Sequence, residues 1–534
     1  MKYYLVISVL ILGCSHKNID SVNKFSDEGI VNIYDLQDQR KTNELLPYLK
    51  AKKESHRITA ALAFASIQDT IAIPYLNQML QIDQDPLPRR AAAFALGQIG
   101  HPVALPMLKS AFDNELHNPN RRYILEAIGK CGEYSTLSLF ENTSYADSSI
   151  RLGWIYGVIR LGQRGFYSDS LNHRVIQMVN DPCKSIARIA AASALKLIHA
   201  EKYILDIDSF VKTLVSSEIA QQFNIVNNPK KYETYNNNWL NTYLELTPYK
   251  QSKKISELKG EGAKKFLYSQ ILSAATHPII KNEAFIRYCE LYPSHKWDLI
   301  TTVLADTNMA LISLAGYEIQ STDVRDLDSL SKQRLIHLCS AAQKKLRLPR
   351  QTETFIDLSN ALYALTQIRQ PLYKPSYNHP IDWKHVQRIP KNQQVSILTN
   401  RGKIILELYV EDAPGTVSNF LKLVANRFYN GKFFHRVVPQ FVIQGGCPRG
   451  DGWGSLNWSQ RSELSHFKSY KTGTVGVASA GKDTEGVQFF ITHCPTPHLD
   501  GRYTLFGRVI KGMEVVHQIE IGDIIQTIKI LETT

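Results

Sequence analysis

The chain has 534 residues, which is too long for one ordinary hydrophobic core, so two or three domains are expected. Its hydrophobic fraction of 44% and charged fraction of 21% are those of an ordinary globular protein. The formal net charge is +13, but no run of Lys and Arg concentrates it, so a generally basic surface is favoured and no nucleic-acid partner is expected.

The first fourteen residues have the pattern of an export signal. Lys2 is followed by an almost wholly apolar run from Leu5 to Leu12, and then by Gly13 and Cys14. Such a run is too short to cross a bilayer as a helix, but it fits the apolar part of a signal peptide. Residues 11–14 resemble a bacterial lipobox, in which the cysteine is lipidated and becomes the new N-terminus. An ordinary secretory signal is the alternative.

The lipobox resemblance carries an expectation about location. It implies a signal peptide over residues 1–13, a lipid on Cys14 and a membrane-anchored protein of the bacterial cell envelope. Ser15 rather than Asp follows the cysteine. By analogy with lipoprotein sorting, this favours the outer membrane, with the protein facing the periplasm. The polar residues 14–43 are then predicted to form a tether that can end in a first helix.

Residues 44–200 repeat one pattern. An arginine opens each unit and is followed by small and apolar residues, at intervals of 32, 32, 30 and 37 residues. These arginines are Arg57, Arg89, Arg121, Arg151 and Arg188. The pattern resembles HEAT-type α-solenoid repeats, which are antiparallel helix pairs that stack and bury a continuous core. The arginines could line a ligand groove, but a structural role at the helix starts is favoured.

Two segments separate the repeats from the C-terminal part. Residues 201–369 have helical patterning of looser period and are predicted to form further irregular α-helical repeats. The aromatic stretch 232–249 is interpreted as a packed connection, with a binding surface as the alternative. Residues 370–392 contain three prolines within a short stretch, which forbids a regular helix and predicts an extended linker.

After the linker the period of the apolar residues changes. Residues 395–398 and 404–408 read as strands of a hairpin around a turn at 399–402, and a helix is predicted from Pro414 to Gly431. A further strand, beginning at Phe433, has alternating apolar and polar residues. The order strand, strand, helix, strand therefore follows from periodicity alone.

Four motifs occur in order in this C-terminal part. They are FHRVVPQFVIQGG at 434–446, ASAG at 478–481, GVQFFIT at 486–492 and LDGRYTLFGRV at 499–509. Together they resemble the cyclophilin family of peptidyl-prolyl cis-trans isomerases, over about 140 of the 534 residues. The isomerase domain is assigned to residues 393–534. The expected architecture is a multidomain chain with an N-terminal all-α HEAT-like solenoid and a C-terminal cyclophilin-like closed β-barrel with flanking helices.

The chemistry of this family is rotation about an X-Pro amide bond, which needs no nucleophile, metal or cofactor. The barrier is about 18–20 kcal/mol because the nitrogen lone pair is delocalised. A guanidinium suits the reaction because it is always charged and can donate to the prolyl nitrogen or to a neighbouring carbonyl. Arg436 is that candidate, and the catalytic positions implied by the resemblance are Arg436, Phe441, Gln444 and Phe490.

The resemblance also implies which residues hold the peptide. Phe441, Phe490 and two further positions match the apolar socket for proline, and others match the stretch that pairs with the peptide main chain. The substrate-binding positions are Val442, Ala478, Ser479, Gln488, His498, Leu499 and Tyr503. Several depart from the common pattern, for example His498, which stands where many cyclophilins carry Trp.

Other reactive residues do not form a recognised site. His493, Cys494 and His498 lack a metal-ligand spacing, so no metal site is expected. Six cysteines besides Cys14 are scattered along the chain, and Cys447 and Cys494 could pair in an oxidising compartment. His435 is interpreted as a structural neighbour of the candidate arginine and not as a general base.

The sequence thus predicts an isomerase that assists the folding of exported proteins. Its partners would be proline-containing polypeptide clients, the membrane through the lipid on Cys14, and a client or partner protein on the solenoid. The alternative is a non-catalytic scaffold whose barrel binds proline-containing peptides.

Overall fold

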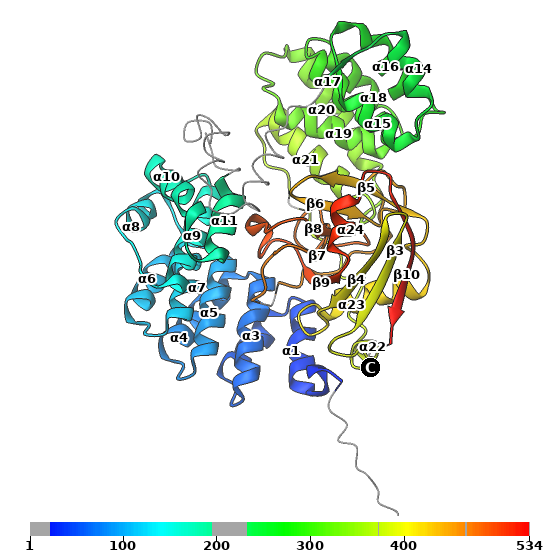
Figure 1. Cartoon of the computed structure of the whole chain (residues 1–534). Coiled ribbons are helices and arrows are strands. Elements are labelled where there is room, and N and C mark those ends of the chain that lie inside the picture. The colour runs from blue at the N-terminus through cyan, green and yellow to red at the C-terminus, as the bar shows by residue number, and fades with distance from the viewer. Residues whose placement is uncertain (1–21, 195–231, 372, 465–466, 533–534) are drawn as a thin grey trace, which may run out of the picture.

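A computed structural model describes residues 22–194, 232–371, 373–464 and 467–532 of the chain. The first helical part is a HEAT solenoid, the second is a more irregular helical bundle, and the C-terminal part is a closed β-barrel that contacts both (Figure 1). The predicted fold class is therefore confirmed. The predicted signal peptide, Cys14 and residues 201–231 lie outside the described residues. Within the described ranges, no helix has the length and apolar character needed to cross a bilayer.

The segment that precedes the solenoid differs from the predicted tether. It forms η1 (Lys24–Ser26) and α1 (Glu28–Asp38), and its apolar side chains pack into the core of the barrel. Phe25, Ile30 and Tyr34 are buried there, and the Asp27 carboxylate caps α1 by accepting from the backbone N–H of Gly29. The predicted first helix is therefore present, but residues 22–38 are packed on the barrel and are not a loose tether, because the polar composition hid a short apolar helix face.

The solenoid consists of helix pairs joined by short 3₁₀ turns. Its elements are α2 (Thr42–Leu45), η2 (Leu46–Lys50), α3 (Glu54–Ile67), η3 (Thr70–Ala72), α4 (Ile73–Ile82), α5 (Pro86–Ile99), η4 (Pro102–Ala104), α6 (Leu105–Asn114), α7 (Asn118–Cys131), η5 (Tyr134–Thr136), α8 (Leu137–Glu141), α9 (Ser148–Gln163), α10 (Asp169–Gln177), η6 (Met178–Asn180) and α11 (Lys184–Ala194). One continuous apolar core runs through these helices. Small residues bring the helices close, since a side chain at Gly129 of α7 would collide with the backbone of Gly157 of α9.

The repeated arginines tie the first helix of a repeat to the end of its second helix. Arg57 Nε lies 2.8 Å from a carboxylate oxygen of Asp83, and Arg89 Nε lies 2.9 Å from one of Glu115. Each pairs with an acidic residue 26 positions further on, after the next helix of the solenoid. These contacts agree with the structural interpretation of the arginines and not with a ligand groove.

The second helical bundle packs around its own core. Its elements are β1 (Glu233–Thr234), α14 (Asn237–Leu244), α15 (Pro248–Ser256), β2 (Leu258–Lys259), η8 (Glu261–Ala263), α16 (Lys264–Leu272), α17 (Pro278–Leu291), α18 (Lys296–Leu304), α19 (Met309–Ser321), α20 (Ser329–Lys344) and α21 (Thr352–Thr366). The aromatic stretch 232–249 is a packed connection, because Trp239 stacks on Tyr243 with ring centroids 5.1 Å apart. Tyr249 reaches the barrel, where its ring lies 4.8 Å from that of Phe433.

The barrel closes through eight strands in the order β10-β3-β4-β9-β7-β8-β6-β5. The strands are β3 (Gln394–Thr399), β4 (Gly402–Leu408), β5 (Lys432–Val438), β6 (Val442–Gly445), β7 (Thr474–Val477), β8 (Phe489–Thr492), β9 (Leu505–Lys511) and β10 (Ile524–Leu531). Helices α22 (Trp383–Val386), α23 (Pro414–Ala425), α24 (Met513–Gln518) and the turn η9 (Pro497–Leu499) flank them. The predicted hairpin is present, and the predicted helix begins at Pro414 but ends at Ala425.

The proline-rich segment has no regular helix or strand over residues 373–382, as predicted, but α22 lies within the predicted linker and the segment is docked on the rest of the protein. The Tyr377 hydroxyl donates to the buried carboxylate of Asp38 at 3.0 Å, and the backbone N–H of Ile381 donates to the same carboxylate. The imidazole of His379 stacks on Trp458 of the barrel with ring centroids 4.0 Å apart. The segment therefore joins the first helix to the barrel and is not a loose linker.

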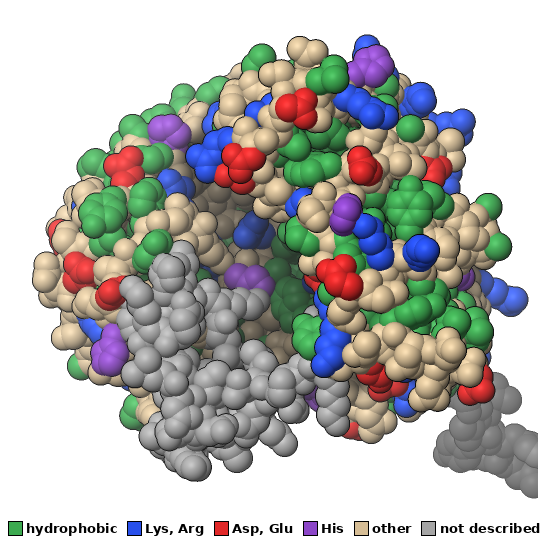
Figure 2. All heavy atoms as spheres, turned by 90° about the horizontal axis from the view of Figure 1, so that it is seen from above, with side chains coloured by type: hydrophobic (Ala, Val, Ile, Leu, Met, Phe, Trp, Pro, Cys, Tyr) green, Lys and Arg blue, Asp and Glu red, His purple; other side chains and the backbone are tan. Residues whose placement is uncertain are grey.

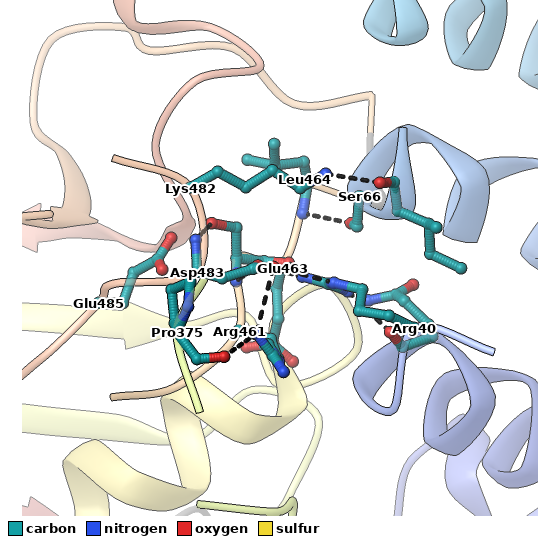
Figure 3. A network of polar contacts seen from close by, with 12 residues as sticks. Arg40, Ser66, Pro375, Arg461, Glu463, Leu464, Lys482, Asp483 and Glu485 are labelled. Atoms are coloured by element: carbon teal, nitrogen blue, oxygen red, sulfur yellow. Dashed lines mark hydrogen bonds and ion pairs between the residues drawn. The ribbon is translucent and has the colours of Figure 1, made fainter. Parts of the chain in front are cut away.

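A polar network attaches the start of the solenoid to two loops of the barrel (Figure 3). Arg40 forms an ion pair with the buried Asp483 and donates to the carbonyl of Ser462 at 3.1 Å. The backbone N–H of Leu464 donates to the Ser66 hydroxyl of α3 at 2.8 Å. The loop that carries Asp483 is continuous with the ASAG motif at 478–481, so the network fixes one edge of the candidate site.

A second attachment lies at the turn η9. The carbonyl of Pro497 accepts from the buried guanidinium of Arg160 at 2.7 Å, and the carbonyl of Gly501 accepts from the Gln98 amide at 2.8 Å. Between the two attachments, Phe467 lies edge-on against Phe94 and Tyr123 of the solenoid. The solenoid therefore holds the loops of the barrel from one end of the candidate site to the other.

Candidate active site

Three neighbouring strands bring the central candidate residues together. In the antiparallel register, Arg436 of β5 pairs with Gln444 of β6, and Gln444 pairs with Phe490 of β8. Directly opposed residues of antiparallel strands point to the same face of the sheet. The alternation of the sequence therefore places a guanidinium, an amide and a phenyl ring in one row across the outer surface of the barrel.

Arg436 extends over an aromatic ring. Its guanidinium carbon lies 5.7 Å from the centroid of the Phe441 ring, which is within the range of a cation–π contact. Burial in the groove lowers the pKa of Arg436, and the nearby Tyr503 hydroxyl acts in the opposite direction. The ordinary pKa of arginine is above 12, so the side chain remains a cation at neutral pH. It is a permanent donor beside an apolar surface.

An apolar socket adjoins the arginine and is separate from the core of the barrel. Its buried members are Val442, Tyr470, Phe490, Leu499 and Leu505, and Phe441, Ala478 and Tyr503 pack around its rim. Ring contacts fix its shape, since Phe490 stacks on one tyrosine at 5.5 Å and meets another edge-on at 6.0 Å. A pyrrolidine ring could enter this socket without burying a polar group.

Gln444 is oriented by a second glutamine. The amide of Gln444 donates to Oε1 of Gln488 at 3.0 Å. The Gln488 amide in turn donates to the carbonyls of Gly452 and Gly454, at 2.6 and 2.9 Å. This chain leads from the loop at 452–454 to the row that contains Arg436, so Gln488 positions Gln444 through its own two contacts.

These residues line one groove of about 650 Å³. Its lining comes from the barrel and from the second helical bundle, and the view from above shows a hollow in the surface (Figure 2). Ten of the positions named from the sequence line it, namely Arg436, Phe441, Val442, Gln444, Ala478, Ser479, Gln488, Phe490, Leu499 and Tyr503. The volume is that of a ligand pocket and can hold a short stretch of extended polypeptide.

His498 is the one position of the candidate set within the barrel that does not line this groove. Its ring lies 5.2 Å from that of Phe441, and it lines a smaller cavity against α9, α10 and α11 of the solenoid. The imidazole therefore contacts the Phe441 ring and the cavity at the solenoid, and it is not part of the groove lining.

Some groove residues were missed by sequence reasoning. Trp453 lines the groove from the loop that Gln488 holds, and a whole wall comes from α17 and from residues 349–354 of the second helical bundle. No motif marked these residues. They reach the site only through tertiary packing between segments far apart in the chain, which a local pattern does not record.

The titratable neighbours do not form an acid–base pair. Burial lowers the pKa of His435 to about 4, so the imidazole is neutral at physiological pH, in line with a structural role. Within the ranges that the structure describes, no three His, Cys, Asp or Glu side chains are grouped as metal ligands would be. Cys447 and Cys494 are separate thiols and not a disulfide.

The comparisons with known proteins agree with this geometry. A family model described as cyclophilin type peptidyl-prolyl cis-trans isomerase/CLD matches residues 394–534, and a model of HEAT repeats matches residues 42–129. A peptidyl-prolyl cis-trans isomerase of Helicobacter pylori is 43% identical over 145 residues, which are 27% of this chain and 89% of that protein. Peptidyl-prolyl cis-trans isomerase B of Bacillus subtilis is 45% identical over 135 residues, or 25% of this chain and 94% of that protein.

A third relative has the same extent. A peptidyl-prolyl cis-trans isomerase of Synechococcus elongatus is 43% identical over 140 residues, which are 26% of this chain and 96% of that protein. In each case nearly the whole relative aligns with the barrel that carries the arginine, the socket and the groove. The chain belongs to the cyclophilin-type peptidyl-prolyl cis-trans isomerases, and HEAT repeats precede its isomerase domain.

Proposed function

We propose that Arg436 is the catalytic group of this isomerase and that the groove holds a proline-containing segment of a client polypeptide. The observation that carries the proposal is the position of the guanidinium, 5.7 Å from the Phe441 ring at the rim of an apolar socket. A proline seated against Phe490 would place its imide nitrogen within the reach of a long side chain fixed beside it.

The expected catalysis follows from the electronic structure of the amide. As the X-Pro bond twists, the nitrogen loses conjugation and becomes a better hydrogen-bond acceptor. A charge-assisted bond from Arg436 that is worth about 1.5–3 kcal/mol more in the twisted state gives roughly 10- to 150-fold acceleration. The remaining acceleration would come from the socket and the sheet edge, which hold the two sides of the bond in a strained pose.

The other groove residues have supporting roles in this proposal. Gln444, oriented by Gln488, would donate to or accept from the peptide backbone beside the proline. The stretch Ala478–Ser479 follows β7 directly and offers backbone groups to an extended peptide, in the manner of an added strand. Phe441 and Phe490 would provide the apolar contact that recognises proline.

We further propose that the protein works on exported proteins while anchored by a lipid on Cys14. Support comes from the sequence, in which a short apolar run ends in Gly13 and Cys14. The described part begins at residue 22, and Phe25 packs on the barrel, so only a few residues would separate the anchor from the isomerase. Such an enzyme would act close to the membrane surface, on chains that emerge unfolded into the periplasm.

The role of the helical regions in client binding is part of the same proposal. Helices of the solenoid contact loops of the barrel through Arg40, Ser66, Gln98 and Arg160, so a client or partner on the solenoid would use its other surfaces. The second helical bundle supplies one wall of the groove, which makes it the helical region nearest to a bound client.

A refolding assay separates the enzyme from the scaffold alternative. The full chain is added in small amounts to an unfolded protein whose refolding is limited by X-Pro isomerisation, a step that takes tens to hundreds of seconds unaided. The isomerase accelerates this phase, and Arg436→Ala removes the acceleration. A scaffold would bind the unfolded protein and leave the slow phase unchanged or slower in both versions of the chain.

The anchor is tested in cells. Wild type is expected in the membrane fraction with a lipid-modified N-terminus, and Cys14→Ala is expected to lose the lipid and leave the membrane after salt washing. Recovery of both versions in the same soluble fraction would contradict the anchor and favour the ordinary secretory signal.

A further inference from the structure

The groove has a second wall that does not belong to the isomerase domain. It is formed by α17 and by residues 349–354, which lead into α21, and it faces the row of Arg436 and Gln444 across the groove. The groove of about 650 Å³ thus lies between the barrel on one side and the second helical bundle on the other. A polypeptide in the socket would therefore meet this wall with the residues that flank its proline.

One side chain of this wall is buried without a partner. Asn282 of α17 is only 3% exposed and lines the groove, yet neither its amide nitrogen nor its amide oxygen has a hydrogen-bond partner among the described residues. Leaving a buried donor and acceptor unpaired is costly. The pair of unused groups matches the N–H and C=O of a peptide unit, which would satisfy both at once.

A carboxylate lies on the same wall. Glu353, in the first turn of α21, lines the groove and is exposed to it, and no hydrogen bond or ion pair joins it to another of the described residues. Although part of the side chain is accessible, the protein around the carboxyl group desolvates it and raises the pKa of Glu353 to about 7, and the carboxylates of Asp357 and Asp451 add to the effect. A bound ammonium or guanidinium group would relieve this unfavourable environment.

The wall is not uniformly acidic. Glu283 of α17 also lines the groove, whereas Arg350 contributes an exposed positive charge to the same wall. A cation bound at Glu353 would be attracted by the carboxylates and repelled by Arg350. Removal of Glu353 should therefore weaken a preference for basic peptides, and removal of Arg350 should strengthen it.

We propose that this wall is a second subsite of the isomerase, which binds the main chain of a client segment through Asn282 and a Lys or Arg side chain near the proline through Glu353. The inference rests on the proposed function of the groove and names its substrate class, which is extended polypeptide with a basic residue close to the proline. The second helical bundle would thus restrict which proline-containing segments the isomerase domain accepts.

The test measures kcat/KM of the full chain for X-Pro exchange at about pH 8, where Glu353 is mostly ionised. The peptides share one central X-Pro pair. A short peptide spans only the socket, and longer ones carry Lys, Glu or norleucine at each position on either side of the proline. Wild type is expected to favour the longer peptides and, at one or more positions, to favour Lys over Glu by about tenfold.

Three variants assign the effect to residues. Glu353→Gln should abolish the Lys preference, and Arg350→Gln should increase it, while the norleucine peptide is unaffected by either. Asn282→Leu should remove the advantage of the longer peptides and leave the short peptide unchanged. Its thermal stability should equal or exceed that of wild type, because an unpaired buried amide is replaced by an apolar group of similar size. Glu245→Gln, at the exposed end of α14, is the matched charge control.

The outcomes distinguish this inference from the function it rests on. If the short peptide is exchanged in an Arg436-dependent way, but Lys and Glu peptides are equal and Asn282→Leu has no effect, the subsite is refuted and the isomerase stands. If exchange of the short peptide does not depend on Arg436, the proposed function itself fails. Faster turnover of all long peptides in the wall variants would show a wall that obstructs clients, which also overturns the inference.

Discussion

Arg160→Met tests whether the solenoid holds the proline socket in shape. Arg160 is 3% exposed, and its guanidinium donates to Glu126 at 2.9 and 3.1 Å and to the carbonyl of Pro497 at 2.7 Å. It also lies 3.7 Å from the carboxylate of Asp500. The turn it holds ends at Leu499, a buried wall of the socket, so one side chain joins α9 to the proline site.

The size of the effect follows from the charges that remain. Lys130 and Arg160 together lower the pKa of Glu126 to about 2, whereas burial raises the pKa of Asp500 to about 7. Removal of the guanidinium leaves the ionised Glu126 with Lys130 as its remaining close cation. The loss of stability should therefore stay below the about 3–5 kcal/mol that a buried charge left without any partner would cost. If about 1.4 kcal/mol of that loss appears as a displaced Leu499, kcat/KM falls about tenfold.

The assay combines chemical unfolding with X-Pro peptide exchange on the full chain. Arg164→Met is the matched control, because Arg164 lies one turn further along and donates to carbonyls of Gly132 and Gly100 within the solenoid. The control should lose little stability and keep its kcat/KM. Equal stability and equal kcat/KM in wild type and Arg160→Met would refute the idea that the solenoid braces the socket.

Three further predictions concern other contacts. In a double-mutant cycle of Arg40→Leu and Asp483→Asn, we expect a coupling free energy above about 1 kcal/mol, because both side chains are largely buried. If the two losses of unfolding free energy simply add, the ion pair does not attach the barrel to the solenoid. Asp38→Asn should gain stability over wild type by up to about 3 kcal/mol between pH 4 and pH 7. The reason is that burial raises the pKa of Asp38 to about 6, so the protonated carboxyl group contributes to the stability of wild type below its ordinary pKa. This contribution is lost as the pH rises through 6. A difference in unfolding free energy between the two proteins that does not change with pH would refute this. Gln488→Leu should raise KM several-fold and change kcat less, since it releases Gln444 and the loop at 452–454; an unchanged KM in peptide exchange would show that this positioning is not needed.

Much of the architecture could be predicted because its signals are local. The 32-residue spacing of arginines and small residues marks the solenoid, and the alternation around Arg436 marks a strand with one face toward a pocket. The resemblance named Arg436, Gln444 and Phe490 as catalytic positions, and the antiparallel register of three strands brings them side by side on one surface.

The features that were missed depend on contacts between distant segments. Phe25 of η1 and Tyr34 of α1 pack on the barrel, which lies far away in the sequence, so residues 14–43 were predicted to be a tether that can end in a first helix. Asn282 and Glu353 reach the groove through the packing of one domain on another, and no spacing relates them to Arg436. His498 occupies a motif position, but its ring contacts Phe441 and lines the cavity at the solenoid.

The most direct test of the central claim measures cis–trans exchange of a short X-Pro peptide by NMR exchange spectroscopy, together with the dissociation constant of the same peptide. Small amounts of the full chain should accelerate exchange in wild type. Arg436→Ala should lower the catalysed rate by roughly 10- to 150-fold, as expected for one charge-assisted hydrogen bond made in the twisted state, while the peptide still binds in the socket. An Arg436→Ala chain that exchanges the peptide as fast as wild type would contradict the account.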